Sequence, residues 1–137
     1  MEERLKQLIE ELVQLPGPSG QEELVAAYLQ ERFKPYADET WIDKSGNSIA
    51  KFNGPSGRTV VVTAHMDEVF SVVERVRDGL VYVKIGCSMD PENLAGVPAE
   101  VLTESGKRIR GVYGSSTIHL KKWEKPCDLF VDTGGVV

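Results

Sequence analysis

Hydrophobic positions follow a helical period near the amino terminus and a strand period afterwards. Residues 2–14 place leucine, isoleucine and valine at i, i+3, i+4, i+7 and i+8, with glutamate and lysine mostly on the other face. This spacing predicts an amphipathic helix over residues 2–14. Pro16 and Pro18 end it, because proline lacks an amide hydrogen and disfavours helical geometry in the residue before it.

A second helix is predicted after this break. Apolar side chains recur at helical spacing from Leu24 to Phe33, and Pro35 follows. The segment Ser19-Gly20-Gln21-Glu22 has the form of a capping box, in which the serine hydroxyl and the glutamate carboxylate each bind a free backbone amide at the start of a helix.

The strand period begins near Ala37. Residues 39–43 and 48–52 flank Lys44-Ser45-Gly46-Asn47, whose glycine and asparagine suit a tight turn, so we predict a hairpin. Residues 59–64 then form a run dominated by threonine and valine. Such a run is typical of a strand covered on both faces, and we expect it to be the most buried element of the chain.

Beyond His65 the pattern shows short strands without a helical period. This spacing suits a small antiparallel barrel or sandwich, and we place a domain boundary near Glu68. The predicted strands are residues 69–76, 80–85, 99–103, 108–113 and 128–132.

Charge and composition narrow the classes of partner. The chain has 137 residues with 16 basic and 21 acidic side chains, and the first 40 residues hold the whole acidic surplus, 9 against 4. Without a basic surplus, a nucleic-acid or anionic-membrane partner is disfavoured. The chain shows neither an apolar stretch of membrane-spanning length nor a secretory signal, so we expect a cytoplasmic protein. Cys87 and Cys127 are expected to be reduced packing residues.

The candidate chemistry lies in Ala64-His65-Met66-Asp67-Glu68, at the carboxyl end of the predicted buried strand, where open α/β sheets place their ligands. Strand alternation puts His65 and Asp67 on one side, so Asp67 can orient a group that His65 binds. Glu68 points the other way, which argues against a glycosidase pair of convergent carboxylates and favours a structural role. Spacing alone leaves both a metal or catalytic role and a structural His–Asp contact open.

Five blocks of the sequence carry a resemblance to a known family. In order and spacing they resemble the N-terminal part of the glutamyl-aminopeptidase and endoglucanase-like metallopeptidases, whose members assemble as tetrahedral aminopeptidases. The blocks are Leu15-Pro16-Gly17-Pro18-Ser19-Gly20-Gln21-Glu22, Asp43-Lys44-Ser45-Gly46-Asn47, Ala64-His65-Met66-Asp67-Glu68-Val69, Arg110-Gly111-Val112-Tyr113-Gly114 with His119, and Asp128-Leu129-Phe130-Val131-Asp132-Thr133-Gly134.

The resemblance implies an α/β fold with two domains. Residues 1–68 would be the N-terminal part of a metallopeptidase catalytic domain, containing two helices, a hairpin and a buried strand. Residues 69–127 would form a small β-rich, barrel-like assembly domain. Residues 128–137 would start a strand that returns toward the rest of the catalytic domain.

The same resemblance implies the site residues. His65 matches the family's first metal-binding histidine, and Asp67 matches the acidic residue that supports it and counts among the catalytic residues. Two divalent cations, zinc or cobalt, would occupy the complete site, while the remaining ligands and a general-base glutamate would lie beyond residue 137. His119 matches a recurrent histidine with either a structural or interface role or a substrate-side role. Trp41 and Trp123 are expected to be packing or interface residues.

Two functions of different classes follow. The leading hypothesis is a metal-dependent aminopeptidase that cleaves short peptides from their N-terminus and forms a homo-oligomer through its β-rich domain, present here as a fragment that is inactive alone and binds no metal tightly. The alternative is a non-catalytic assembly or binding protein derived from that family. An endoglucanase is disfavoured because no convergent carboxylate pair is visible.

Overall fold

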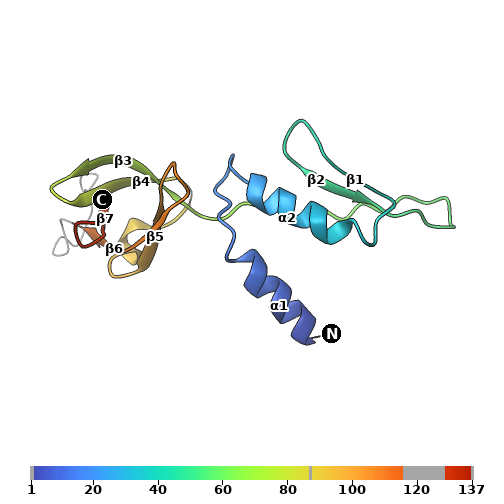
Figure 1. Ribbon diagram of the computed structural model, residues 1–137, viewed down its shortest axis with the longest axis horizontal. Coiled ribbons are helices and arrows are strands. Elements are labelled where there is room, and N and C mark those ends of the chain that lie inside the picture. Colours follow the sequence, from blue (N-terminus) through green and yellow to red (C-terminus); the bar gives the residue numbers. More distant parts are fainter. Residues whose placement is uncertain (1, 87, 116–128, 137) are drawn as a thin grey trace. The chain divides into compact units, whose positions relative to one another are not determined.

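Two compact units, residues 1–68 and residues 69–137, make up the chain. The computed structural model describes residues 2–86, 88–115 and 129–136. Each unit has its own sheet (Figure 1). The predicted mixture of helices and antiparallel strands is confirmed, and no helix of the described residues is long and apolar enough to cross a membrane.

The first unit contains both predicted helices and the predicted hairpin. Helix α1 spans Glu2–Leu12 and helix α2 spans Glu23–Phe33, and strands β1 (Glu39–Ile42) and β2 (Ser48–Lys51) pair antiparallel. The Asp43 carboxylate organises the turn between them, because it accepts hydrogen bonds from the Ser45 amide and from the backbone and side chain of Asn47, each at 2.9 Å.

Side-chain contacts join the helices and the hairpin. The Gln30 side chain, on α2, donates to the Trp41 carbonyl at 3.0 Å and to the Ser48 hydroxyl at 2.8 Å. The Glu11 carboxylate, on α1 (Glu2–Leu12), meets both the Tyr28 hydroxyl and the Arg32 guanidinium of α2. These polar contacts hold a unit whose buried apolar side chains, among the described residues, are Val25 and Ala26.

The prediction of a buried strand at residues 59–64 is wrong. This segment belongs to no strand of the described residues, and Val60, Val61 and Val62 are 85%, 77% and 91% exposed. A strand needs a neighbouring strand to bind its backbone N–H and C=O groups. Within the described residues no strand pairs with residues 59–64, so the β-branched run lacks the partner that its composition suits.

The second unit is a curled sheet of five antiparallel strands in the order β3-β4-β7-β6-β5 (Figure 1). The predicted strands are confirmed with small shifts at their ends. They are β3 (Ser71–Arg77), β4 (Leu80–Ile85), β5 (Pro98–Leu102), β6 (Arg108–Ser115) and β7 (Leu129–Asp132), and a short 3-10 helix, η1, spans Pro91–Asn93. The core of the sheet comprises Val81, Val83, Leu129 and Val131.

Strand β7 pairs with both β4 and β6 inside the sheet of the second unit. Leu129 and Val131 are buried there because they face the same core as Val81. That residues 128–137 begin a return toward the catalytic domain stays a prediction. Cys87, His119, Trp123 and Cys127 lie outside the described residues, so their expected roles stay predictions.

Candidate functional site

The candidate site lies where residues 64–68 run beside the loop that leads into α2. The Glu68 amide donates to the Gly17 carbonyl at 2.8 Å, and the Gly17 amide donates to the Glu68 carboxylate at 3.0 Å. Pro18 and Glu68 also form a parallel bridge. Glu68 therefore links two segments that are about fifty residues apart in sequence.

The close approach at Gly17 explains its residue type. A β-carbon at this position would lie 2.9 Å from Val25 Cγ2 and 3.4 Å from the Met66 carbonyl oxygen. Any larger residue would push the loop away from α2 or from residues 64–68, since the added carbon would overlap Val25 and crowd the backbone at Met66.

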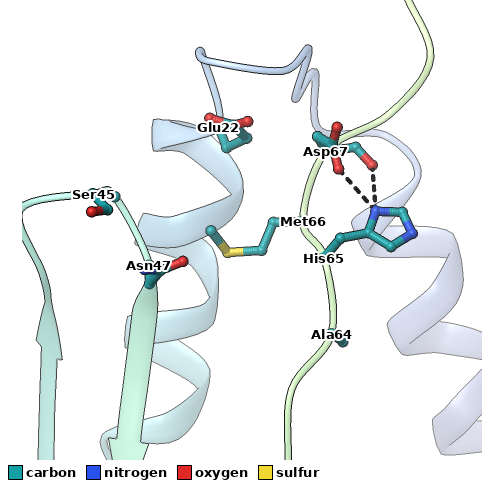
Figure 2. A pocket seen from close by; sticks show the side chains of 8 residues that line it. Glu22, Ser45, Asn47, Ala64, His65, Met66 and Asp67 are labelled. Carbon is teal, nitrogen blue, oxygen red and sulfur yellow. Dashed lines mark hydrogen bonds and ion pairs between the residues drawn. The ribbon is translucent and has the colours of Figure 1, made fainter. Parts of the chain in front are cut away.

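His65 and Asp67 contact each other in this segment (Figure 2). The His65 Nδ1 lies 2.9 Å from Asp67 Oδ1 and 3.1 Å from the Asp67 carbonyl oxygen. Both neighbours are acceptors when the carboxylate is ionised, so in the neutral imidazole Nδ1 carries the hydrogen and Nε2 carries the free lone pair. The imidazole is 86% exposed and the Asp67 side chain 39% exposed, so Nε2 belongs to an accessible ring.

Ser19 completes the contact, which the sequence pattern did not predict. Its hydroxyl donates to Asp67 Oδ2 at 2.5 Å. The expected capping box is therefore wrong: α2 begins after Glu22 without a side-chain cap hydrogen bond, and the Glu22 carboxylate accepts from the Gly20 amide at 2.7 Å. A missing cap costs a helix about 1 kcal/mol, while an ionised carboxylate is a stronger acceptor for the hydroxyl than a neutral group.

Both hydrogen bonds favour the charged form of Asp67. The Ser19 hydroxyl is the larger cause and the His65 ring the second, and together they lower the pKa of Asp67 below its ordinary value. Asp67 is therefore an anion at neutral pH, which is the state that can hold and polarise an imidazole N–H.

The hairpin turn contributes to the same site. A pocket of about 200 Å³ is lined by residues of the turn between β1 and β2, by residues 64–67 and by Glu22 (Figure 2). The sequence pattern predicts Ser45 and Asn47 only as turn residues. Their membership of one of the five motif blocks was the signal that could have placed them at the site.

The residues present fit part of a metal site. Neutral imidazole nitrogen is a common ligand for zinc and related divalent ions, and Nε2 of His65 is free for that use. In the part of the chain that the structure describes, however, no group of three or more His, Cys, Asp or Glu side chains could hold a metal ion. A catalytic zinc typically takes three protein ligands, so the described residues by themselves do not make up such a site.

Comparison with known proteins identifies the family. The family model described as M42 glutamyl aminopeptidase matches residues 46–134, which include the site segment and all five strands of the second unit. The chain belongs to the M42 glutamyl aminopeptidase family. The resemblance seen in the five motif blocks is thus confirmed.

Individual relatives agree with this assignment. The lysyl aminopeptidase of Pyrococcus furiosus is 35% identical over 133 residues, which cover 96% of this chain and 36% of that protein. Among solved structures, an aminopeptidase from the archaeon Desulfurococcus kamchatkensis matches 93% of this chain and 36% of its own chain, with a TM-score of 0.83 and 30% identity.

A third M42 relative is known as an assembly. The TET1 peptidase of Pyrococcus horikoshii, described as assembling into a tetrahedron or a large octahedral shell, matches 92% of this chain and 39% of its own chain, with a TM-score of 0.71 and 27% identity. The 137 residues therefore span a little over a third of the length of the relatives that they match.

Proposed function

We propose that these residues are the N-terminal part of a metal-dependent aminopeptidase that hydrolyses short peptides. The observation that carries the proposal is the His65 ring, held at Nδ1 by an anionic carboxylate 2.9 Å away. Metal-binding histidines commonly donate their second N–H to a carboxylate in this way. Membership of an aminopeptidase family supplies the reaction class.

In this proposal His65 is a metal ligand through Nε2, and Asp67 fixes its tautomer and raises its basicity. Two divalent cations, zinc or cobalt, would supply the Lewis acidity for hydrolysis of a peptide bond when bound. The described residues hold and orient the imidazole, while further ligands and the general base come from outside these 137 residues. The chain alone would therefore be inactive.

The two units would have different tasks. Residues 1–68 would contribute to the catalytic domain, because they carry His65, Asp67 and the pocket. Residues 69–127 would mediate assembly into a homo-oligomer, since the TET1 relative forms large shells. We place the enzyme in the cytoplasm.

The first test is the denatured mass of the protein from its native source, followed by a peptidase assay. We expect a mass of about two to three times 15.1 kDa, the range of a two-domain hydrolase. The purified protein should release N-terminal residues from short peptides, lose this activity to a chelator and regain it with zinc or cobalt.

Substitution links the activity to the site. In the longer protein, His65→Ala should lower the metal-restored activity by at least about 100-fold, because loss of a ligand exceeds the effect of a changed outer partner. Arg58→Ala, an exposed change a few residues before the site, should retain activity. Equal activity of the two variants would contradict the role of His65.

A non-catalytic assembly or binding protein remains the second candidate. It is favoured by the absence of a three-ligand group in the described part of the chain. A native mass of 15.1 kDa without chelator-sensitive peptidase activity would support it and reject the enzyme.

A further inference from the structure

We propose that Ser19 is a positioning residue whose hydroxyl locks the Asp67 carboxylate and thereby selects the Nδ1–H tautomer of His65, so that Nε2 carries the lone pair. The consequence for metal binding rests on the proposed function.

The Asp67 carboxylate is held at both oxygens by different partners. Oδ1 accepts from the His65 ring at 2.9 Å, and Oδ2 accepts from the Ser19 hydroxyl at 2.5 Å. The terminal torsion of an aspartate is broad and roughly two-fold, so one hydrogen bond leaves the group free to turn and exchange its oxygens. Two hydrogen bonds from different partners remove that freedom and keep one oxygen aimed at the ring.

Ser19 can hold the carboxylate because the backbone holds Ser19. The Gln21 amide donates to the Pro18 carbonyl at 2.8 Å, which closes a turn around residues 19 and 20. Gly20 has a φ of +85° in this turn, a value that the third position of a type II turn requires and glycine adopts without strain. On the other side of Ser19, Gly17 and Glu68 exchange two hydrogen bonds of 2.8 and 3.0 Å.

The Ser19 hydroxyl also makes no capping hydrogen bond to α2. The sequence pattern assigns it to an amide of α2, but that helix starts without a side-chain cap. A residue that departs from its expected local hydrogen bond is typical of a functional site. Ser19 binds Asp67 instead, 48 positions along the chain.

The fixed carboxylate determines which nitrogen of the His65 ring carries the hydrogen. An ionised carboxylate only accepts hydrogen bonds, so a fixed Oδ1 demands a hydrogen on Nδ1. Free imidazole side chains in water favour the opposite tautomer, with the hydrogen on Nε2. The Ser19–Asp67–His65 chain therefore prepares the lone pair on Nε2 before any ligand arrives.

The test reads the tautomer directly. The chain has two histidines, so in a His119→Gln background every imidazole nitrogen signal belongs to His65. Long-range 15N–1H correlation spectra of this 137-residue chain at pH 8.5, well above the ordinary pKa of histidine, would give the ratio of the two tautomers. We expect the Nδ1–H form to predominate, whereas an unstructured segment would show the Nε2–H form.

Three variants separate positioning from packing. Ser19→Ala should lower the ratio of Nδ1–H to Nε2–H by about fivefold, the effect of losing one hydrogen bond. Ser19→Thr, which keeps the hydroxyl, should retain the ratio. Ser45→Ala should retain it too, because Ser45 lines the same pocket but meets Asp43 through its backbone amide.

Two outcomes would overturn the proposal. The first is a Ser19→Ala variant with the tautomer ratio of the parent and an unchanged amide spectrum. If that variant loses its fold, Ser19→Cys, which keeps the volume with a weaker donor, replaces it, and a parental ratio there is the second overturning result.

Metal binding separates this inference from the proposed function. In the longer protein, Ser19→Ala should weaken zinc binding by about 10-fold or more, as loss of outer-shell partners does. If the tautomer responds as expected and the longer protein shows no peptidase activity, the positioning role stands and the proposed function fails. If the longer protein is active and the tautomer ratio of the 137-residue chain does not respond to Ser19→Ala, the proposed function stands and the positioning role fails.

Discussion

Two valine-rich segments of this chain have opposite environments. In residues 59–64, Val60, Val61 and Val62 are 77–91% exposed, whereas in β4 Val81 is fully buried and Val83 is 8% exposed. Strand β4 has β3 on one edge and β7 on the other, and within the described residues the first segment has no paired strand. The comparison shows that β-branched composition favours a strand, while burial depends on the elements that cover it.

The comparison bears on the proposed function as well. A run of three exposed valines is unusual on the surface of a folded protein and marks a place where another element packs. In the proposed longer enzyme, the covering strands would come from the region that corresponds to the unmatched part of the relatives. The core of the second unit is formed by its own strands.

The largest contrast should appear in amide hydrogen exchange. Amides of β4 that pair with β3 and β7 should open only with global unfolding of the second unit, while residues 59–64 should exchange near the unprotected rate, a difference of at least about 100-fold. Exchange measured by NMR on the 137-residue chain would show it. Comparable protection of the two segments would refute the contrast, and protection of residues 59–64 in the longer protein would support the proposed packing.

Truncation of one valine in each segment should give the next largest effect. Val81→Ala removes two buried methyl groups from a close-packed core and should lower the free energy of unfolding by about 2–3 kcal/mol. Val61→Ala, the same change at a side chain that is 77% exposed, should alter it by less than about 0.5 kcal/mol. Chemical denaturation checks both, and similar losses would mean that residues 59–64 are covered in solution.

Replacing one glycine in each unit by alanine tests the same contrast by adding a methyl group. A β-carbon on Gly111 of β6 would lie 2.5 Å from Val131 Cγ1 and 2.6 Å from the Asp132 carbonyl oxygen, while nothing lies within 4 Å of one on Gly54. Gly111→Ala should therefore cost about 1–3 kcal/mol through overpacking, and Gly54→Ala less than about 0.5 kcal/mol. Thermal unfolding monitored separately for each unit would measure both changes. An unchanged melting temperature of the second unit in Gly111→Ala would contradict the close contacts.

The smallest effect should be a pH dependence confined to the first unit. Two hydrogen bonds from Asn47 lower the pKa of Asp43 below its ordinary value, the larger effect coming from the Asn47 side chain and the smaller from its backbone N–H. A lowered folded pKa stabilises the unit above the unfolded pKa, and the stabilisation is lost as pH falls through the folded value. Melting temperatures from pH 6 to pH 2 should thus show D43N less stable than the parent at pH 6, with the difference shrinking on acidification. A difference that grows at low pH would contradict this.

Local sequence rules predicted most elements because each carried its own signal. The helical spacing up to Leu12, the turn residues around Gly46 and the short alternating strands correspond to observed elements within a few residues. The rules failed at Ser19, whose hydroxyl binds a carboxylate 48 positions away instead of capping α2. They placed β7 among the strands beyond His65 but not its neighbours, because pairing with β4 and β6 rather than its own residues sets its position in the sheet.

The amino-acid sequence by itself determined the family, the order of the helices and strands, and the His65–Asp67 pair, since periodicity, turn chemistry and motif spacing are local properties. Only the tertiary structure decided that Ser19 and Glu68 tie the loop before α2 to that pair, that the hairpin turn lines the same pocket, and that residues 59–64 stay exposed. The physical reason is that hydrogen-bond partners and burial are relations between distant segments, and one segment does not encode what lies beside it.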